Sequence, residues 1–292
     1  MYELVKTGDK SYFINSPAKI GVYVTENADV YLIDSGNDKD AGRKVRKILD
    51  ENGWNLKGII NTHSHADHIG GNHYLQGQTN CKIFASEIET AFTKNPILEP
   101  AFLYGGYPCS DLRHKFLLAA ESEALEITDV SFPPELITIP LPGHFFDMIG
   151  IRTPDNTIFL ADCLSSISTL EKYQISFIYD VAAYLETLKR VGEMDANIFV
   201  PAHTEPMTDT KELIEINRNK VYEITDKLLT FCKSPLGFEE ILQKIFDDYS
   251  LTMDFEQYVL VGSTIRSYLS WMKDTGKIDV SIYKNKLLWQ QV

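Results

Sequence analysis

The sequence predicts a mixed α/β (α+β) fold, in which two β-sheets form a sandwich and helices cover its outer faces. Short β-rich segments alternate with amphipathic helical segments through the first 200 residues, a pattern typical of helices packed outside two sheets. The 292 residues are enough for one large domain or two. Hydrophobic residues make up 44% of the chain and charged residues 24%, as in ordinary globular proteins.

The elements of the first half follow from hydrophobic periodicity and turn residues. Three β-rich runs separated by Asn and Pro predict an antiparallel meander. An amphipathic helix follows, and Gly53 ends it. The expected strands are 11–14, 20–24, 30–34, 58–61 and 82–84, and the expected helices are 38–52 and 68–75.

Residues 91–134 interrupt this alternation with prolines, glycines and aromatic residues. A segment of this length predicts an insertion rather than a simple connection. It could form a lid or pocket wall, with Tyr104, Tyr107 and His114 as candidate substrate contacts. The alternative is a surface subdomain that only packs.

The strand pattern resumes at residue 136, and helices dominate after residue 208. We therefore expect a catalytic domain at 1–207 and a C-terminal helical domain at 208–292. The expected strands are 136–139, 148–151, 157–160 and 198–200, the helices are 180–193, 211–232, 238–249 and 254–273, and 277–289 forms a terminal β-hairpin. Helices followed by a hairpin resemble a winged helix. Packing or dimerisation is favoured over DNA binding as the role of this region. Residues 211–292 have 11 Lys and Arg against 12 Asp and Glu, whereas a DNA-binding surface is usually basic.

One stretch carries the chemistry of the chain. His63, His65, Asp67 and His68 lie within six positions, directly after the predicted strand 58–61 and before Gly70-Gly71. Residues two apart in an extended segment point the same way, so His63 and His65 can share one ion. Asp67 and His68 fall at the start of a helix and can serve a neighbouring ion. The spacing predicts a metal site.

Three further candidate ligands follow predicted strands. His144 lies in Leu-Pro-Gly-His, Asp162 ends the strand 157–162, and His203 ends the strand that contains 198–200. Loops at strand ends gather into active-site rims. His73 and His114 have no such placement, so we do not expect them to bind metal.

The His-x-His-x-Asp-His string resembles the signature of the metallo-β-lactamase fold superfamily, over roughly residues 10–207. The resemblance implies an αββα sandwich, two divalent ions and hydrolysis by a metal-bridging hydroxide. Zinc is the first expectation for the metal, with iron or manganese as alternatives. The resemblance also implies the roles of the site residues: His63, His65 and His144 for site one, Asp67, His68 and His203 for site two, and Asp162 as the bridge.

The resemblance implies that Asp67 orients the nucleophile and returns its proton. Asp34 either supports a metal ligand from behind or caps a turn. One branch of the family carries Cys at the bridging position, whereas this chain has Asp162, as in the glyoxalase II and ribonuclease branches. The cationic residues with which glyoxalase II binds glutathione have no recognisable match here.

These features predict a hydrolase of a small ester, thioester or lactone. The alternatives are a phosphodiesterase or ribonuclease of the same fold, an iron-dependent oxidoreductase of the fold, and a non-catalytic DNA-binding regulator. The net charge of −13 disfavours nucleic acid as a partner. A small-molecule substrate, no membrane association and a cytoplasmic location are expected, because the apolar runs are short and the N-terminus lacks a signal-peptide pattern. A homodimer remains open.

The four cysteines, Cys81, Cys109, Cys163 and Cys232, are widely spaced and form no C-x-x-C pair. We expect reduced thiols rather than a disulfide framework. Cys163 follows a predicted ligand, and neighbouring residues of a strand face opposite ways. It is therefore expected in the core or behind the ligands.

Overall fold

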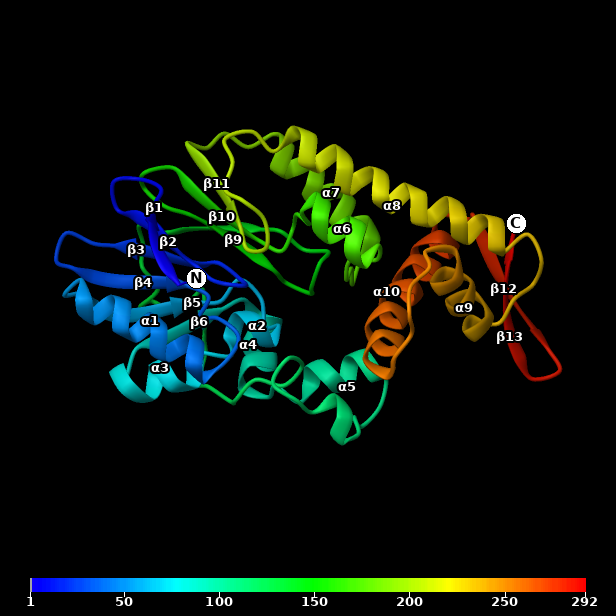
Figure 1. Cartoon of the computed structure of the whole chain (residues 1–292), viewed down its shortest axis with the longest axis horizontal. Coiled ribbons are helices and arrows are strands. Elements are labelled where there is room, and N and C mark those ends of the chain that lie inside the picture. The colour runs from blue at the N-terminus through cyan, green and yellow to red at the C-terminus, as the bar shows by residue number, and fades with distance from the viewer. Residues whose placement is uncertain (1) are drawn as a thin grey trace.

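The computed structural model describes residues 2–292 and confirms the predicted αββα sandwich (Figure 1). The first sheet contains, in spatial order, β1 (Glu3–Lys6), β2 (Ser11–Asn15), β3 (Ile20–Val24), β4 (Asp29–Ile33), β5 (Asn55–Ile60), β6 (Lys82–Ala85) and β7 (Leu125–Glu126). The second contains β11 (Ile198–Pro201), β10 (Thr157–Ala161), β9 (Ile149–Arg152) and β8 (Ile137–Pro140). Helices α1 (Lys39–Glu51) and α3 (Asn72–Thr79) cover the first sheet, and α7 (Val181–Gly192) covers the second.

The two-residue period of the strands divides the buried side chains among the layers. In β4, Leu32 packs with the cluster under α1, whereas Ile33 packs between the sheets. In β10, Phe159 lies between the sheets, whereas Ile158 and Leu160 pack with the cluster that includes α7. Each sheet is therefore buried on both faces, which fixes its register and the position of the loops at its edge.

The prediction of one continuous helix at 68–75 is wrong, because two short helices occupy this region. Helix α2 (Ala66–Ile69) ends before Gly70, and α3 begins after Gly71. A Cβ on Gly70 would lie 2.3 Å from the backbone of Asn37, and a Cβ on Gly71 would lie 2.3 Å from the carbonyl oxygen of Ser35. Only glycine allows this approach, and the break holds α2 against the loop that follows β4.

The segment 91–134 contains more regular structure than the sequence indicated. It begins within α4 (Glu87–Lys94) and includes α5 (Leu98–Tyr104) and a 3₁₀ turn at Ser110–Leu112. Its later part returns to the first sheet, where β7 pairs with β6 in parallel. The segment is therefore partly an extension of the sheet and partly a helical excursion that contacts the C-terminal helices. Strand β1 and helix α6 (Ile167–Tyr173) were likewise not predicted.

The C-terminal third contains the three expected helices and the expected hairpin. They are α8 (Lys211–Phe231), α9 (Phe238–Asp248), α10 (Phe255–Asp274), β12 (Ile278–Tyr283) and β13 (Lys286–Gln291). One hydrophobic cluster joins Leu188 of α7 to Val221 of α8 and Ile265 of α10. The C-terminal helices thus continue the core of the second sheet. The division at residue 207 and the winged-helix likeness stay predictions.

None of the helices formed by residues 2–292 has the length and apolar character needed to cross a membrane.

Candidate metal centre

The candidate ligands meet at one edge of the sandwich because parallel strands end there. Strands β4 and β5 run in parallel in the first sheet, and β10 and β11 in the second. The loop of residues 61–65 follows β5 and leads into α2. Asp162 directly follows β10, and His203 lies two residues after the end of β11. His144 lies in the loop between β8 and β9. All seven candidate residues therefore come from strand ends or from the first turn of α2.

Three histidines form the first group. The distance from His63 Nε2 to His65 Nδ1 is 3.1 Å, and His144 Nε2 lies 3.2 Å from the same Nδ1 atom. The loop before His144 can approach α7 because Gly143 has a φ of +123°, and a Cβ there would lie 2.3 Å from the backbone nitrogen of Tyr184.

Asp67, His68 and His203 form the second group. Asp67 Oδ2 lies 3.2 Å from His203 Nε2 and 3.7 Å from His68 Nε2. Asp162 reaches both groups: its Oδ1 lies 3.2 Å from His68 Nε2, and its Oδ2 lies 3.2 Å from His203 Nε2 and 3.7 Å from His144 Nε2. The partition into two sites with one shared carboxylate stays a prediction.

The donor atoms fit divalent metal ions. Within each of three groups of three residues, the ligand atoms lie within 4.8 Å of one another. Buried His68 Nε2 and Asp162 Oδ1 lie 3.2 Å from each other, but neither makes a hydrogen bond of good geometry within the described residues. Such atoms are costly in a protein interior unless an ion or another polar group satisfies them. Imidazole and carboxylate together are the ligands of catalytic zinc and related metals.

The two groups differ in electrostatics. Burial, together with the neighbouring imidazoles, holds the pKa of His63 well below its usual value and lowers the pKa of His65 to about 3. Burial also lowers the pKa of His144. These three imidazoles are neutral at pH 7, the form that coordinates metal. Asp162 raises the pKa of His203 to about 10, against the effect of burial.

Asp34 supports the cluster from behind. Its Oδ2 accepts a hydrogen bond from His68 Nδ1 at 2.8 Å and another from the Thr62 hydroxyl at 2.7 Å. Its Oδ1 accepts from the backbone N–H of Thr62 at 2.8 Å. Asp34 has a φ of 64°, which Asp tolerates better than most residues. Of the two predicted roles, contact with a candidate ligand is the one that this geometry supports.

Sequence analysis missed two buried carboxyl groups that hold the loops. Glu89 Oε2 accepts hydrogen bonds from the backbone nitrogen (2.9 Å) and hydroxyl (2.6 Å) of Ser64, and its Oε1 accepts from the backbone nitrogen of Asp147 (3.0 Å). Burial raises the pKa of Glu89 to about 7. Glu99 of α5 is buried near Ala66, and burial raises its pKa well above normal. Glu89 thus joins the two loops that carry the first histidine group, and no local sequence pattern marks it.

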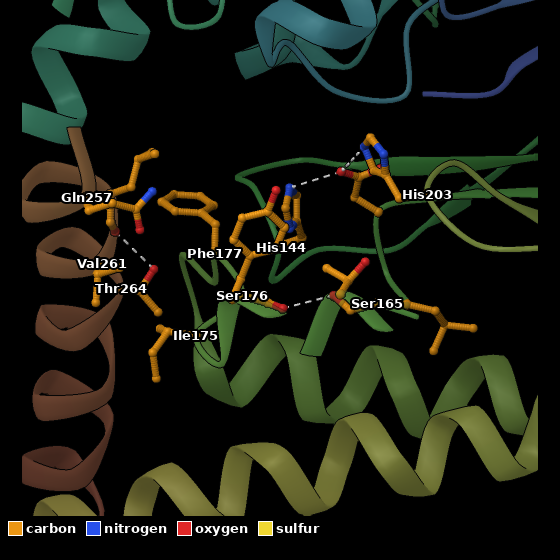
Figure 2. Close-up of a pocket in the computed structure, with 14 residues that line it drawn as sticks. His144, Ser165, Ile175, Ser176, Phe177, His203, Gln257, Val261 and Thr264 are labelled. Atoms are coloured by element: carbon orange, nitrogen blue, oxygen red, sulfur yellow. Dashed lines mark hydrogen bonds and ion pairs between the residues drawn. The ribbon is translucent and has the colours of Figure 1, made fainter. Parts of the chain in front are cut away.

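A pocket of about 270 Å³ opens beside the cluster (Figure 2). Its walls come from the cluster itself, from residues 164–177 and from α10. Figure 2 shows Phe177 next to His144, and the two ring centroids are 5.6 Å apart. Helix α10, which the sequence indicated only as a packing or dimerisation element, therefore lies in direct contact with the site.

The predicted substrate contacts lie elsewhere. Tyr104 packs near Phe255 of α10, and Tyr107 is 75% exposed. His114 Nε2 lies 3.3 Å from Glu256 Oε2. None of these three residues lines the pocket beside the cluster. Helix α5 and the turn after it pack against α10.

The structure places the remaining candidates as follows. His73 lies outside the cluster, with its Nδ1 2.7 Å from the carbonyl oxygen of Glu121. Cys163 is fully buried in the core of the second sheet. No disulfide joins the four cysteines within the described part of the chain.

The sandwich and the histidine–aspartate cluster at its edge define the class of this protein as an αββα fold with a candidate metal centre. Residues 21–203 match the metallo-beta-lactamase superfamily, and the chain belongs to this family. The family resemblance inferred from the His-x-His-x-Asp-His string is confirmed.

Several known proteins are similar to the chain. It is 32% identical over 207 residues to the probable metallo-hydrolase YybB of Bacillus subtilis (strain 168), covering 68% of this chain and 88% of that protein. It is 22% identical over 254 residues, 73% of this chain, to the linear primary-alkylsulfatase of Pseudomonas sp. (strain ATCC 19151). It is 30% identical over 131 residues, 44% of this chain, to the hydroxyacylglutathione hydrolase of Rhodopseudomonas palustris (strain BisB18). The chain covers 47% and 42% of the last two proteins, about half of their length.

A solved structure of a beta-lactamase domain protein from Burkholderia ambifaria has the same fold, with a TM-score of 0.74 and 14% identity. The match covers 99% of this chain and 94% of that one. The likeness therefore includes the C-terminal helices as well as the sandwich.

Proposed function

We propose that the chain is a dinuclear metal-dependent hydrolase of a small ester, thioester or lactone. The observation that supports two ions is the position of Asp162, whose two oxygen atoms face both histidine groups. His63, His65 and His144 would hold the first ion, Asp67, His68 and His203 the second, and Asp162 both. Zinc is the proposed metal, because neutral imidazoles with carboxylates suit it.

Two bound divalent ions would supply a water that loses its proton near neutral pH and would polarise the scissile carbonyl. The chain contributes the geometry around this chemistry. Asp67 Oδ2 lies in the second group with its side chain 36% exposed, so it can accept a proton from an attacking water and return it to the leaving group. Asp34 holds His68, and Glu89 holds the loops of the first group.

The lining of the pocket supports a carboxylic ester rather than a phosphoric ester as the substrate. In the described structure, no lysine or arginine lines it, whereas phosphate groups are usually bound by such side chains. The similarity to a hydroxyacylglutathione hydrolase is consistent with a thioester as one member of the class.

Activity on matched substrates tests this proposal. The zinc-loaded chain is given an aryl ester, a thioester, a lactone and an aryl phosphodiester with the same leaving group as the ester. We expect turnover of one or more carboxyl derivatives with a higher kcat/KM than for the phosphodiester. The His63→Ala variant is the control and should be inactive on all four. Preferential cleavage of the phosphodiester would favour the nuclease branch and contradict the proposal.

A further inference from the structure

We infer that the pocket beside the metal centre binds an uncharged, mainly apolar chain of the substrate, and that one face of α10 selects for its length and charge. The inference rests on the proposed function for the position of the scissile group at the histidine cluster. The inference adds the chemical class of the substrate group next to the scissile bond. It also assigns a binding role to the C-terminal helices.

The α10 wall consists of one helical face. Gln257, Leu260, Val261 and Thr264 line the pocket, and their spacing of i, i+3, i+4 and i+7 places them on the same side of the helix. The Thr264 hydroxyl donates a hydrogen bond to the carbonyl oxygen of Leu260 at 3.2 Å. Because its hydroxyl is satisfied by its own helix, Thr264 offers no free donor to a ligand. Only Gln257 brings an amide group to this wall.

The opposite wall is equally uncharged. Ile175 and Phe177 line it together with the hydroxyl residues Ser165, Thr169, Tyr173 and Ser176. The hydroxyl oxygens of Ser165 and Ser176 lie 2.9 Å apart, so one of these two serines donates its proton to the other. The wall therefore offers a few neutral hydroxyl groups beside aliphatic and aromatic surface. Figure 2 shows Phe177 between Gln257 of α10 and His144.

Charge and size restrict the ligand. Apart from the cluster residues, none of the described side chains lining the pocket is ionisable near pH 7. A carboxylate, phosphate or sulfate at the end of the substrate would lose water without gaining a partner of opposite charge, which is unfavourable. The volume of about 270 Å³ lies near the lower end of small-molecule pockets. A short neutral chain fits both limits.

Binding of alkyl hydroxamates to the zinc-loaded chain tests the inference without turnover. The hydroxamate group binds the metal, and the alkyl chain must then enter the pocket. Calorimetry on acetyl, butanoyl, hexanoyl and decanoyl hydroxamates should show affinity rising by about fourfold per methylene until the pocket is full, and then no further gain. A hydroxamate of hexanoyl length with a terminal carboxylate should bind at least about tenfold more weakly than the neutral one, because its charge is unpaired.

Two lysine variants assign the selectivity to α10. Gln257→Lys adds a cation to the pocket wall and should bring the affinity of the carboxylate-tipped hydroxamate up to or above that of the neutral one. Ser263→Lys adds the same charge to the same helix, but Ser263 lines a different cavity, so the neutral preference should persist. Circular dichroism verifies that both variants fold.

An affinity independent of chain length, a wild-type preference for the carboxylate-tipped probe, or equal effects of the two lysines would overturn the inference. Absence of hydroxamate binding would overturn it as well. If the predicted binding pattern is found but no ester, thioester or lactone is cleaved, the pocket assignment stands and the proposed function fails.

Discussion

Replacing Asp162 with alanine is expected to remove most of the bound metal and nearly all activity. Asp162 is the one carboxylate whose oxygens face both histidine groups, so both ions lose a ligand in Asp162→Ala. Metal ions contribute several kcal/mol of transition-state stabilisation, and about 1.4 kcal/mol corresponds to tenfold in rate, so kcat/KM should fall by about a thousandfold or more. Elemental analysis after gel filtration and steady-state kinetics measure the two effects.

His114→Ala is the matched control for this substitution. His114 lies away from the cluster, near Glu256 on α10, so metal content and kcat/KM should match the parent chain. Full occupancy of two ions in Asp162→Ala would contradict the bridging role. Loss of metal in His114→Ala would show that the ligand set is wrong.

Replacing Asp34 with asparagine is expected to weaken the second metal site while leaving the shape of the side chain almost unchanged. The Asp34 carboxylate only accepts hydrogen bonds, so His68 must carry its proton on Nδ1 and leave Nε2 free to bind metal. In Asp34→Asn, an amide NH₂ that faces His68 favours the opposite tautomer, with the proton on Nε2. If the amide is flipped, its NH₂ group instead faces the backbone N–H of Thr62, and these two donors repel each other.

Residues that hold a metal ligand from behind contribute about 10- to 100-fold to metal affinity. We expect a loss of that size for one of two ions in Asp34→Asn, measured by competition with a chromophoric chelator. Asp38→Asn is the control, because Asp38 caps α1 through the backbone N–H of Ala41 and Asn caps helices equally well. If Asp34→Asn binds both ions as tightly as the unsubstituted chain does, this role of Asp34 is refuted.

The parts of the site that follow from local sequence were predictable. His63, His65, Asp67 and His68 occupy one short stretch, and His144, Asp162 and His203 each follow a strand that periodicity reveals. Parallel pairing then brings these strand ends together. Asp34 was recognisable for the same reason, since it directly follows β4.

The parts that depend on tertiary packing were not predictable. Glu89 resembles an ordinary helix-surface carboxylate in the sequence, yet it is fully buried against Ser64, which comes from a different element. The pocket face of α10 has the spacing of any core-facing stripe, and only the packing of the C-terminal third decides that it faces the metal centre. The aromatic residues Tyr104 and Tyr107 indicated substrate contacts, but neither lines the pocket beside the cluster.

The number of metal ions per folded chain tests the dinuclear assignment most directly. The chain is purified, loaded with zinc, freed of excess metal and measured by elemental analysis against protein concentration from amino-acid analysis. We expect about two ions per chain, one for each histidine group and both sharing Asp162. One ion per chain at saturating zinc, with unchanged occupancy when Asp67 and His203 are replaced by alanine, would contradict it.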